Sequence, residues 1–219
     1  MMLVIFDRNR VLIKRREIMH LYTAQAPSPF RVNVFLAEKN IVIPSTVLNV
    51  MEGDTHSADF QAKNSLGEVP VLELDDGTFL TESIAICRYL EHLYPDNPLM
   101  GATPLAEARI EMWNRRMEQQ VFGTVGSIGL HTIPFFADRI EQIPEYAESL
   151  KRLLKKKWAW LDGELADGRT YICDDAFSVA DITGMAALFV CEFVGVDIPD
   201  NFMHLQRWVT ALRTDHKWG

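Results

Sequence analysis

In the first half of the chain, short apolar runs alternate with segments whose apolar residues have helical spacing. Leu21 and Tyr22 lie on a predicted first strand, residues 30–40 form a helix with apolar positions about 3.6 residues apart, and residues 41–50 form a second strand. A helix that crosses over between two strands makes them parallel. Residues 26–29, which include two prolines, are predicted as a loop, and the polar residues 52–64 as a loop with a short helix.

A β-hairpin and a helix complete this half. Residues 71–74 and 78–80 are predicted strands, joined by the turn Asp75-Asp76-Gly77. A helix over residues 83–93 follows, and the proline-containing segment 94–98 ends it as a linker. Residues 19–98 therefore predict an α+β domain with the order β-α-β-(α)-β-β-α, which is thioredoxin-like.

The second half has helical periodicity throughout. Thr103 and Pro104, with Glu107 behind them, indicate a helix start. A further helix over residues 144–165 carries a stripe of leucines. Ser178 and Asp181 resemble a capping box before an apolar run, residues 182–193, that is hydrophobic nearly all round and so predicted to be central. Residues 103–219 therefore predict an all-helical domain, in which Asp181 has a structural role.

The chain has 219 residues, 48% of them hydrophobic, which suffices for two domains with real cores. No apolar run approaches 18 residues, so no membrane span is predicted. The net charge is −8, and residues 19–100 and 101–219 are both acidic, which argues against nucleic acid as a partner. Residues 1–18 carry a net charge of +3 and fit neither a secretory signal nor a transit peptide, so we expect an extension without a function.

The three cysteines are Cys87, Cys173 and Cys191. They are far apart in apolar surroundings and form no C-x-x-C pair, which predicts core residues rather than a redox site. Their odd number suits a reducing cytoplasm. The spacing of cysteine and histidine predicts no metal site.

Two short motifs point to a ligand. In Val69-Pro70 the proline cannot donate a ladder hydrogen bond, so it belongs at a strand start or edge. If this peptide bond is cis, the backbone of Val69 turns outward and can pair with an extended ligand. Glu82-Ser83 opens a helix, whose free N–H groups and positive dipole end suit a carboxylate. Ser83 adds a hydroxyl and Glu82 can meet an ammonium, so the ligand is predicted to end in an amino acid.

This ordered set resembles the N-terminal domain of the cytosolic glutathione transferases, and the resemblance runs from about Met19 to the last residues. In that family the V-P motif pairs with the cysteinyl backbone of glutathione, and the E-S pair holds its γ-glutamyl end. The resemblance implies glutathione as co-substrate. It also implies that His56 contacts the glycine carboxylate, although a solvated loop histidine is the alternative. Glu68 departs from the Lys, Gln or Thr of many relatives, and its charge would repel that carboxylate.

Catalysis in this family requires a donor that stabilises the thiolate. Lowering a thiol pKa of about 8.5 by roughly two units requires about 2.7 kcal/mol. The positions that carry the serine-type catalyst in relatives fall on Ala26 and Pro27, which cannot donate. Ser28 is adjacent and is a candidate donor, with shaping of the loop as the alternative. Tyr22 is a weaker candidate because its place on the strand usually packs inward.

A narrower resemblance suggests a different donor set. The pattern E-M-W-x-R-R-x-E at residues 111–118 and H-T-x-P at residues 131–134 resembles a bacterial and fungal branch that lacks the usual N-terminal catalyst. There, helix-borne serine and histidine are thought to act through water. Ser127 and His131 are four residues apart and share a helix face. Three glycines between residues 123 and 129 favour close packing or room for a ligand. The alternative for His131 is a helix C-terminal cap.

The expected function is therefore a glutathione transferase that conjugates the thiolate to a hydrophobic electrophile in cytoplasmic detoxification. We expect a homodimer, as in most of the family, and an electrophile pocket near Met112, Met117 and Phe122. One alternative is a glutathione-dependent isomerase or dehalogenase on the same scaffold. Another is a non-catalytic glutathione-binding or regulatory protein, which the absence of the usual Tyr, Ser or Cys favours.

Overall fold

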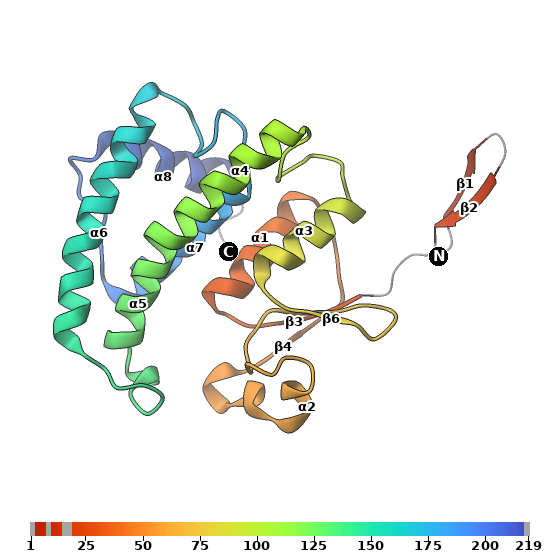
Figure 1. The fold of residues 1–219 in the computed structure, drawn as a ribbon, viewed down its shortest axis with the longest axis horizontal. Helices are drawn as coiled ribbons and strands as arrows, with labels where there is room; N and C mark the ends of the chain where they lie inside the picture. The colour runs from red at the N-terminus through yellow and green to blue at the C-terminus, as the bar shows by residue number, and fades with distance from the viewer. Residues whose placement is uncertain (1–2, 8–9, 15–18, 217–219) are drawn as a thin grey trace. The chain divides into compact units, whose positions relative to one another are not determined.

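The computed structural model describes residues 3–7, 10–14 and 19–216 (Figure 1). Near the N-terminus, β1 (Leu3–Asp7) and β2 (Arg10–Lys14) pair antiparallel. The prediction for residues 1–18, an extension without a function, stays a prediction, and eight of these residues lie outside the described ranges.

The contacts divide the chain into two compact units. One holds the chain up to Ala24 together with Ile43–Glu82, and the other holds Gln25–Val42 together with the chain from Ser83 onward. The second unit therefore includes α1 (Pro27–Glu38) and α3 (Ser83–Leu93) as well as all later helices. The predicted domains, residues 19–98 and 103–219, divide the chain by type of element and stay a prediction.

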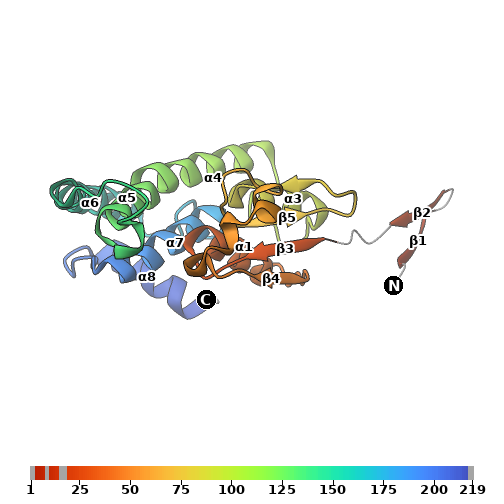
Figure 2. The same ribbon diagram turned by 90° about the horizontal axis from the view of Figure 1, so that it is seen from below.

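A four-stranded sheet forms the centre of the first unit (Figure 2). Its strands are β3 (His20–Thr23), β4 (Ser45–Val47), β5 (Val71–Glu73) and β6 (Phe79–Leu80), in the order β4-β3-β5-β6. β3 and β4 are parallel, whereas β5 is antiparallel to both of its neighbours. The thioredoxin-like order of elements is confirmed. The strand predicted over residues 41–50 is only three residues long, and it begins directly after Pro44, which has no N–H to donate to a ladder.

Between β4 and β5 the chain makes three short helical turns. They are η1 (Val50–Glu52), η2 (Asp54–His56) and α2 (Ala58–Gln61). The side chains of Asn49 and Ser57 accept hydrogen bonds from backbone N–H groups at the starts of η1 and α2. The prediction of a loop with a short helix is confirmed.

One long helical run opens the remainder of the second unit. It consists of α4 (Pro104–Arg116), a π-helical segment (Met117–Phe122) and α5 (Gly123–Thr132), with helical backbone angles at both junctions. As predicted, the Thr103 side chain caps the start of α4 by accepting from Ala106 N–H. π-helical turns within α-helices frequently occur at functional sites. Three further helices follow, namely α6 (Pro144–Glu164), α7 (Val179–Val194) and α8 (Met203–Asp215).

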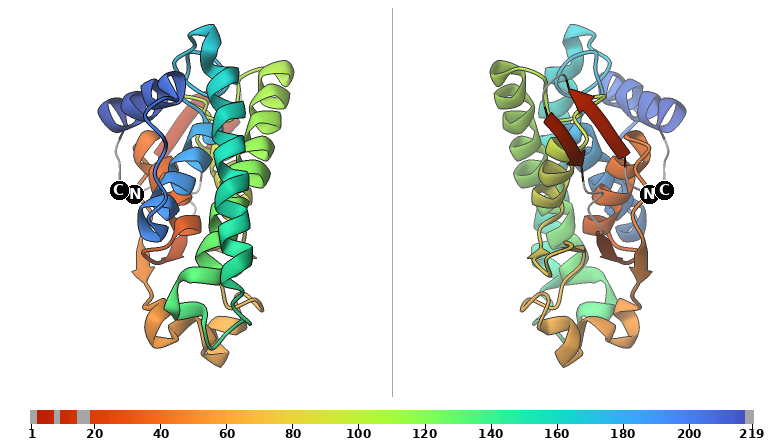
Figure 3. Two further views of the ribbon diagram at one scale, coloured as in Figure 1. Left: turned by 90° about the vertical axis from the view of Figure 1, so that its left-hand side faces the viewer. Right: turned by 90° about the vertical axis from the view of Figure 1, so that its right-hand side faces the viewer.

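The core of this unit lies around α7. Its residues from Val179 to Leu188 are all buried, and α1, α4 and α5 pack against it. α6 in turn packs along α5 (Figure 3). The predicted capping box is confirmed, since Asp181 accepts hydrogen bonds from Ser178 N–H and Oγ, each at 3.0 Å. It also accepts from Trp208 Nε1 at 2.9 Å and Ile172 N–H at 2.8 Å, so its role is structural.

One predicted boundary is wrong. Residues 26–29 were predicted as a loop before a helix at Phe30, but α1 begins at Pro27. Ala26 is the N-cap residue in an extended conformation, and both prolines lie in the first turn. In that turn the backbone N–H groups have no partner within the helix, so prolines are tolerated there. Ser28 is therefore a residue of the first helical turn.

Candidate functional site

The segment before β5 is a tight loop organised by Asn64. The Asn64 amide oxygen accepts from Leu66 N–H at 3.2 Å, and its nitrogen donates to the Glu68 carbonyl at 2.8 Å. The Gly67 N–H donates to the Asn64 carbonyl at 2.9 Å. Asn64 is buried, so these bonds are protected from water. The sequence reasoning missed this residue, and its one local signal is an asparagine ahead of a glycine in a turn segment.

Gly67 brings this loop against the turn that carries His56. Its φ of +64° suits glycine, and a Cβ there would come within 2.9 Å of the Thr55 carbonyl oxygen and 3.4 Å of His56 Nδ1. The His56 side chain is itself exposed. Within the first unit, the loop that leads to Val69 and the η2 turn are thus in direct contact.

The predicted ligand-pairing edge is available at Val69. The Val69–Pro70 peptide is cis, and Pro70 is buried immediately before β5. Among the described residues, no hydrogen bond is made by the backbone N–H or carbonyl of Val69. A backbone N–H and carbonyl left open side by side match what an extended peptide offers. The Glu68 side chain beside it is exposed.

The Glu82-Ser83 step has two unusual features. Glu82 has a φ of +65°, an uncommon conformation for a residue other than glycine and one that is enriched at functional sites. Ser83, the first residue of α3, is only 2% exposed, yet its hydroxyl has no hydrogen-bond partner among the described residues. A buried hydroxyl without a partner costs free energy, so such a group indicates a ligand or an ordered water. The free N–H groups of the α3 start favour an anion at the same place.

The two candidate donors near the first strand differ in their surroundings. Tyr22 donates its hydroxyl proton to Glu73 Oε2 at 2.8 Å. Burial and the neighbouring Glu73 carboxylate raise the pKa of Tyr22, so its hydroxyl keeps its proton in the hydrogen bond to Glu73. Ser28 is half-buried in the first turn of α1. The assignment of Ser28 as a thiol donor stays a prediction.

Ser127 and His131 share one face of α5, as predicted. Ser127 Oγ donates to the Gly123 carbonyl at 2.8 Å. The Ile143 N–H donates to His131 Nδ1 at 3.1 Å, so this nitrogen carries no proton and the ring proton is on Nε2. The His131 ring also meets Tyr146 edge-on, with ring centroids 5.2 Å apart. His131 therefore ties the end of α5 to the start of α6, and its catalytic role stays a prediction.

Two models of known families match the chain: the N-terminal domain of glutathione S-transferase at residues 27–93 and its C-terminal domain at residues 128–214. Glutathione S-transferase 2 of Saccharomyces cerevisiae is 34% identical over 205 residues, which cover 91% of this chain and 88% of the relative. The chain belongs to the glutathione S-transferase family.

Two solved structures of bacterial proteins are similar over most of their length. A glutathione S-transferase domain-containing protein of Marinobacter aquaeolei VT8 has a TM-score of 0.82 at 34% identity, covering 90% of this chain and 98% of that one. A glutathione S-transferase of class Gtt2 from Vibrio parahaemolyticus has a TM-score of 0.77 at 35% identity, covering 89% of this chain and 93% of that one. Glutathione is the co-substrate of this enzyme family.

The expected electrophile pocket of this transferase needs a correction. Met117 is fully buried, close to Gly184 in the core, so it cannot line an open pocket. The ring of Phe122 is covered by the Arg31 guanidinium, 4.7 Å from the ring centroid. Of the three residues named, Met112 alone is exposed, at 41%. The prediction of a pocket at these residues is therefore wrong for Met117.

The glycines of α5 have different surroundings. A Cβ on Gly129 would lie 3.3 Å from Ile133 Cδ1 and 3.6 Å from the nearest Val194 atom, which are a tight contact and an ordinary van der Waals contact. A Cβ on Gly126 would meet nothing within 4 Å. Whether these glycines serve close packing or leave room for a ligand stays a prediction.

The cysteines are core residues, as predicted. Burial raises the pKa of Cys87 and of Cys191 to about 12, and it raises the pKa of Cys173 as well. Thiols with raised pKa values are poor nucleophiles. None of the helices in the described part of this transferase is long and apolar enough to cross a bilayer.

Proposed function

We propose that this chain conjugates the thiolate of glutathione to a hydrophobic electrophile, as a cytoplasmic homodimer. The observation that carries the proposal is the buried Ser83 hydroxyl, which has no partner among the residues that the structure describes and follows a residue of positive φ. This hydroxyl and the α3 N–H groups would bind the γ-glutamyl carboxylate, and Glu82 its ammonium. The open backbone of Val69, positioned by Pro70, would pair with the cysteinyl residue, and His56 would meet the glycine carboxylate.

A water on the face of α5 is the proposed activator of the thiol. His131 Nε2 is the ring nitrogen that carries the proton, so it can donate to a water oxygen. Ser127 Oγ donates its hydroxyl hydrogen bond to the Gly123 carbonyl, so its lone pairs can accept from the same water. A water held in this way has one O–H left to donate to a thiolate. Hydrogen bonds to the charged form lower a pKa. Ser28 is the alternative direct donor.

In the reaction, the thiolate sulfur attacks an electrophilic carbon and a C–S bond forms. In a substitution, the leaving group departs with the bonding electron pair. In an addition, the pair moves to an acceptor atom that is then protonated. The competing function is a glutathione-binding protein without turnover, which is favoured by Ala26 and Pro27 at the usual catalytic positions.

Steady-state kinetics with glutathione and an aryl halide test this proposal. We expect His131→Gln and Ser127→Ala to lower kcat by about tenfold to a hundredfold, while the KM for glutathione changes little, because such donors act on the thiolate in the reaction. His92→Gln is the matched control, since His92 is likewise a histidine in the last turn of a helix. Equal losses in the His92 and His131 variants, or no turnover in the wild type, would contradict the proposal.

A further inference from the structure

A carbonyl in the last turn of α5 lacks the usual donor within its own helix. In an α-helix a carbonyl accepts from the N–H four residues later, but four residues after Leu130 the chain has Pro134, which has no N–H. The Gln142 side chain replaces the missing donor. Its Nε2 donates to the Leu130 carbonyl at 2.8 Å and to the Ile133 carbonyl at 2.9 Å. One amide group thus closes the loop of residues 134–141 onto the end of α5.

This closure brings the next backbone group to His131. Ile143 follows Gln142 as the N-cap of α6, and its N–H donates to His131 Nδ1 at 3.1 Å. Tyr146, in the first turn of α6, lies edge-on against the imidazole. A ring nitrogen that accepts a hydrogen bond carries no proton, so the neutral ring has its proton on Nε2. The place of the Ile143 N–H therefore decides which nitrogen of His131 can donate.

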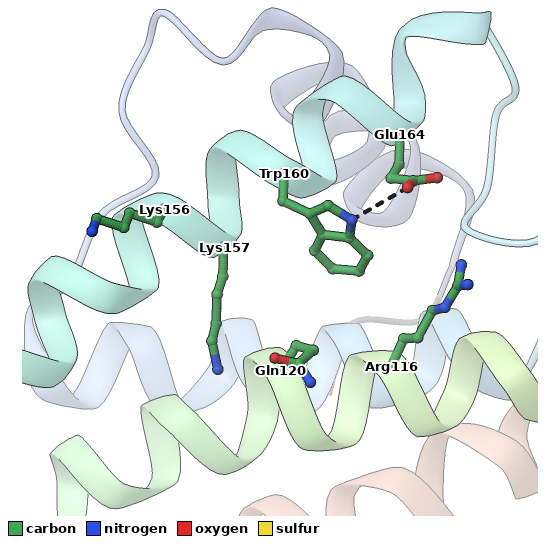
Figure 4. A pocket seen from close by; sticks show the side chains of 6 residues that line it. All are labelled: Arg116, Gln120, Lys156, Lys157, Trp160 and Glu164. Atoms are coloured by element: carbon green, nitrogen blue, oxygen red, sulfur yellow. Dashed lines mark hydrogen bonds between the residues drawn. The ribbon is translucent and has the colours of Figure 1, made fainter.

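The middle of the α5–α6 pair is held by a separate contact. Figure 4 shows Lys157 extending from α6 toward the long helical run, and its ammonium donates to Thr124 Oγ1 at 2.7 Å. An open depression beside this contact is lined by residues that include Arg116, Lys157 and Trp160. Thr124 lies about two turns before His131 on α5, so this contact joins the helices without fixing the loop at the histidine.

We propose that Gln142 is a positioning residue: by holding the loop closed, it presents the Ile143 N–H to His131 and keeps the ring proton on Nε2. The consequence for catalysis rests on the proposed function, in which Nε2 donates to the activating water. With the proton on Nδ1 instead, Nε2 would accept from that water. A water that donates both to Nε2 and to Ser127 has no O–H left for the thiolate.

The ¹⁵N signals of the His131 ring test this positioning without requiring turnover. In long-range ¹H–¹⁵N spectra, a ring nitrogen without a proton resonates far from one that carries a proton. The chain has six histidines, and His131→Gln identifies the signals. At about pH 8, above the ordinary histidine pKa of about 6.5, we expect an unprotonated Nδ1 and a protonated Nε2. Gln142→Met, which has a side chain of similar length without a donor, should move the two signals toward each other.

Gln206→Met is the matched control, because Gln206 Nε2 likewise donates to a loop carbonyl, that of Ile198, at 3.0 Å. It should leave the His131 signals in place. Gln142→Glu covers the case in which Gln142→Met fails to fold, since it keeps the size of the side chain and replaces the donor with a carboxylate that the carbonyls repel. A protonated Nδ1 in the wild type, unmoved signals in the folded Gln142 variant, or equal movement in Gln206→Met would overturn the proposal.

A double-mutant cycle for kcat shows whether Gln142 acts through His131. We expect Gln142→Met to lower kcat by about tenfold with little change in the KM for glutathione, and to have no further effect in a His131→Gln background. A further loss in the double variant would show that Gln142 acts by another route, against the proposal. A wild type without turnover but with the expected ¹⁵N signals would contradict the proposed conjugation and still support the positioning of His131 by Gln142.

Discussion

The Ser83 hydroxyl is the group on which the proposed binding of glutathione most directly depends. It is buried at the start of α3, and no protein group in the described ranges satisfies it. Because native proteins rarely leave a buried hydroxyl without a partner, a ligand atom or an ordered water is expected there.

Ser83→Ala should therefore separate binding from stability. We expect the Kd for glutathione to rise by about tenfold, since one hydrogen bond to a charged group is lost. The free energy of unfolding without ligand should change by less than about 0.5 kcal/mol, because no protein hydrogen bond is broken. Calorimetric titration and urea unfolding measure the two quantities.

Ser178→Ala is the control at another buried serine. Ser178 Oγ donates to Asp181, so its removal should lower stability and leave glutathione affinity unchanged. If Ser83→Ala lowered stability and left the Kd unchanged, the hydroxyl would have a structural role and the assignment would be wrong.

At the scale of elements, the helix α7 depends on glycine for its packing, whereas part of α5 does not. A Cβ on Gly184 in α7 would come within 2.6 Å of the Trp208 ring, but one on Gly126 in α5 would meet nothing within 4 Å. We expect Gly184→Ala to destabilise the protein by about 1–3 kcal/mol through overpacking. Gly126→Ala should stabilise it by up to about 1 kcal/mol through helix propensity.

Urea unfolding of both variants checks this pair, and each is the control for the other. A stabilising Gly184→Ala would show that Trp208 moves aside easily. A strongly destabilising Gly126→Ala would show that the open space at α5 has another occupant.

Helices that have capping residues or a regular apolar spacing in the sequence were predicted well, and elements that lack these features were not. The helix over residues 83–93 and the capping box at Ser178 were confirmed because caps and spacing are written in neighbouring residues. α8 was missed, since Phe202 at its N-cap gives no side-chain cap. The start of α1 was wrong because prolines suit both a loop and a first helical turn.

The candidate site shows the same limit. Val69, Pro70, Glu82 and Ser83 were predicted from short motifs, which are each a continuous piece of backbone, and their role stays a prediction. Asn64 was missed because its role depends on how the loop folds back on itself. The depression lined by Arg116, Lys157 and Trp160 was missed because these residues are brought together only when α6 packs along the preceding helices.

At the scale of the whole molecule, family membership and the arrangement of the fold establish a glutathione transferase, and the finer account concerns how the thiol is activated. Ala26 and Pro27, on which the family resemblance places the usual N-terminal donor, cannot donate a side-chain hydrogen bond, so we expect activation from elsewhere. We propose that a water held by Ser127 and His131 provides it.

The ultraviolet absorbance of the thiolate in the protein–glutathione complex, titrated with pH, tests this assignment most directly. Free glutathione provides the reference, with a thiol pKa near 8.5. We expect an apparent pKa roughly two units lower in the wild-type complex, and a return toward the reference in His131→Gln. Saturated binding with an unshifted thiol pKa would contradict it, and would identify a protein that binds glutathione without activating it.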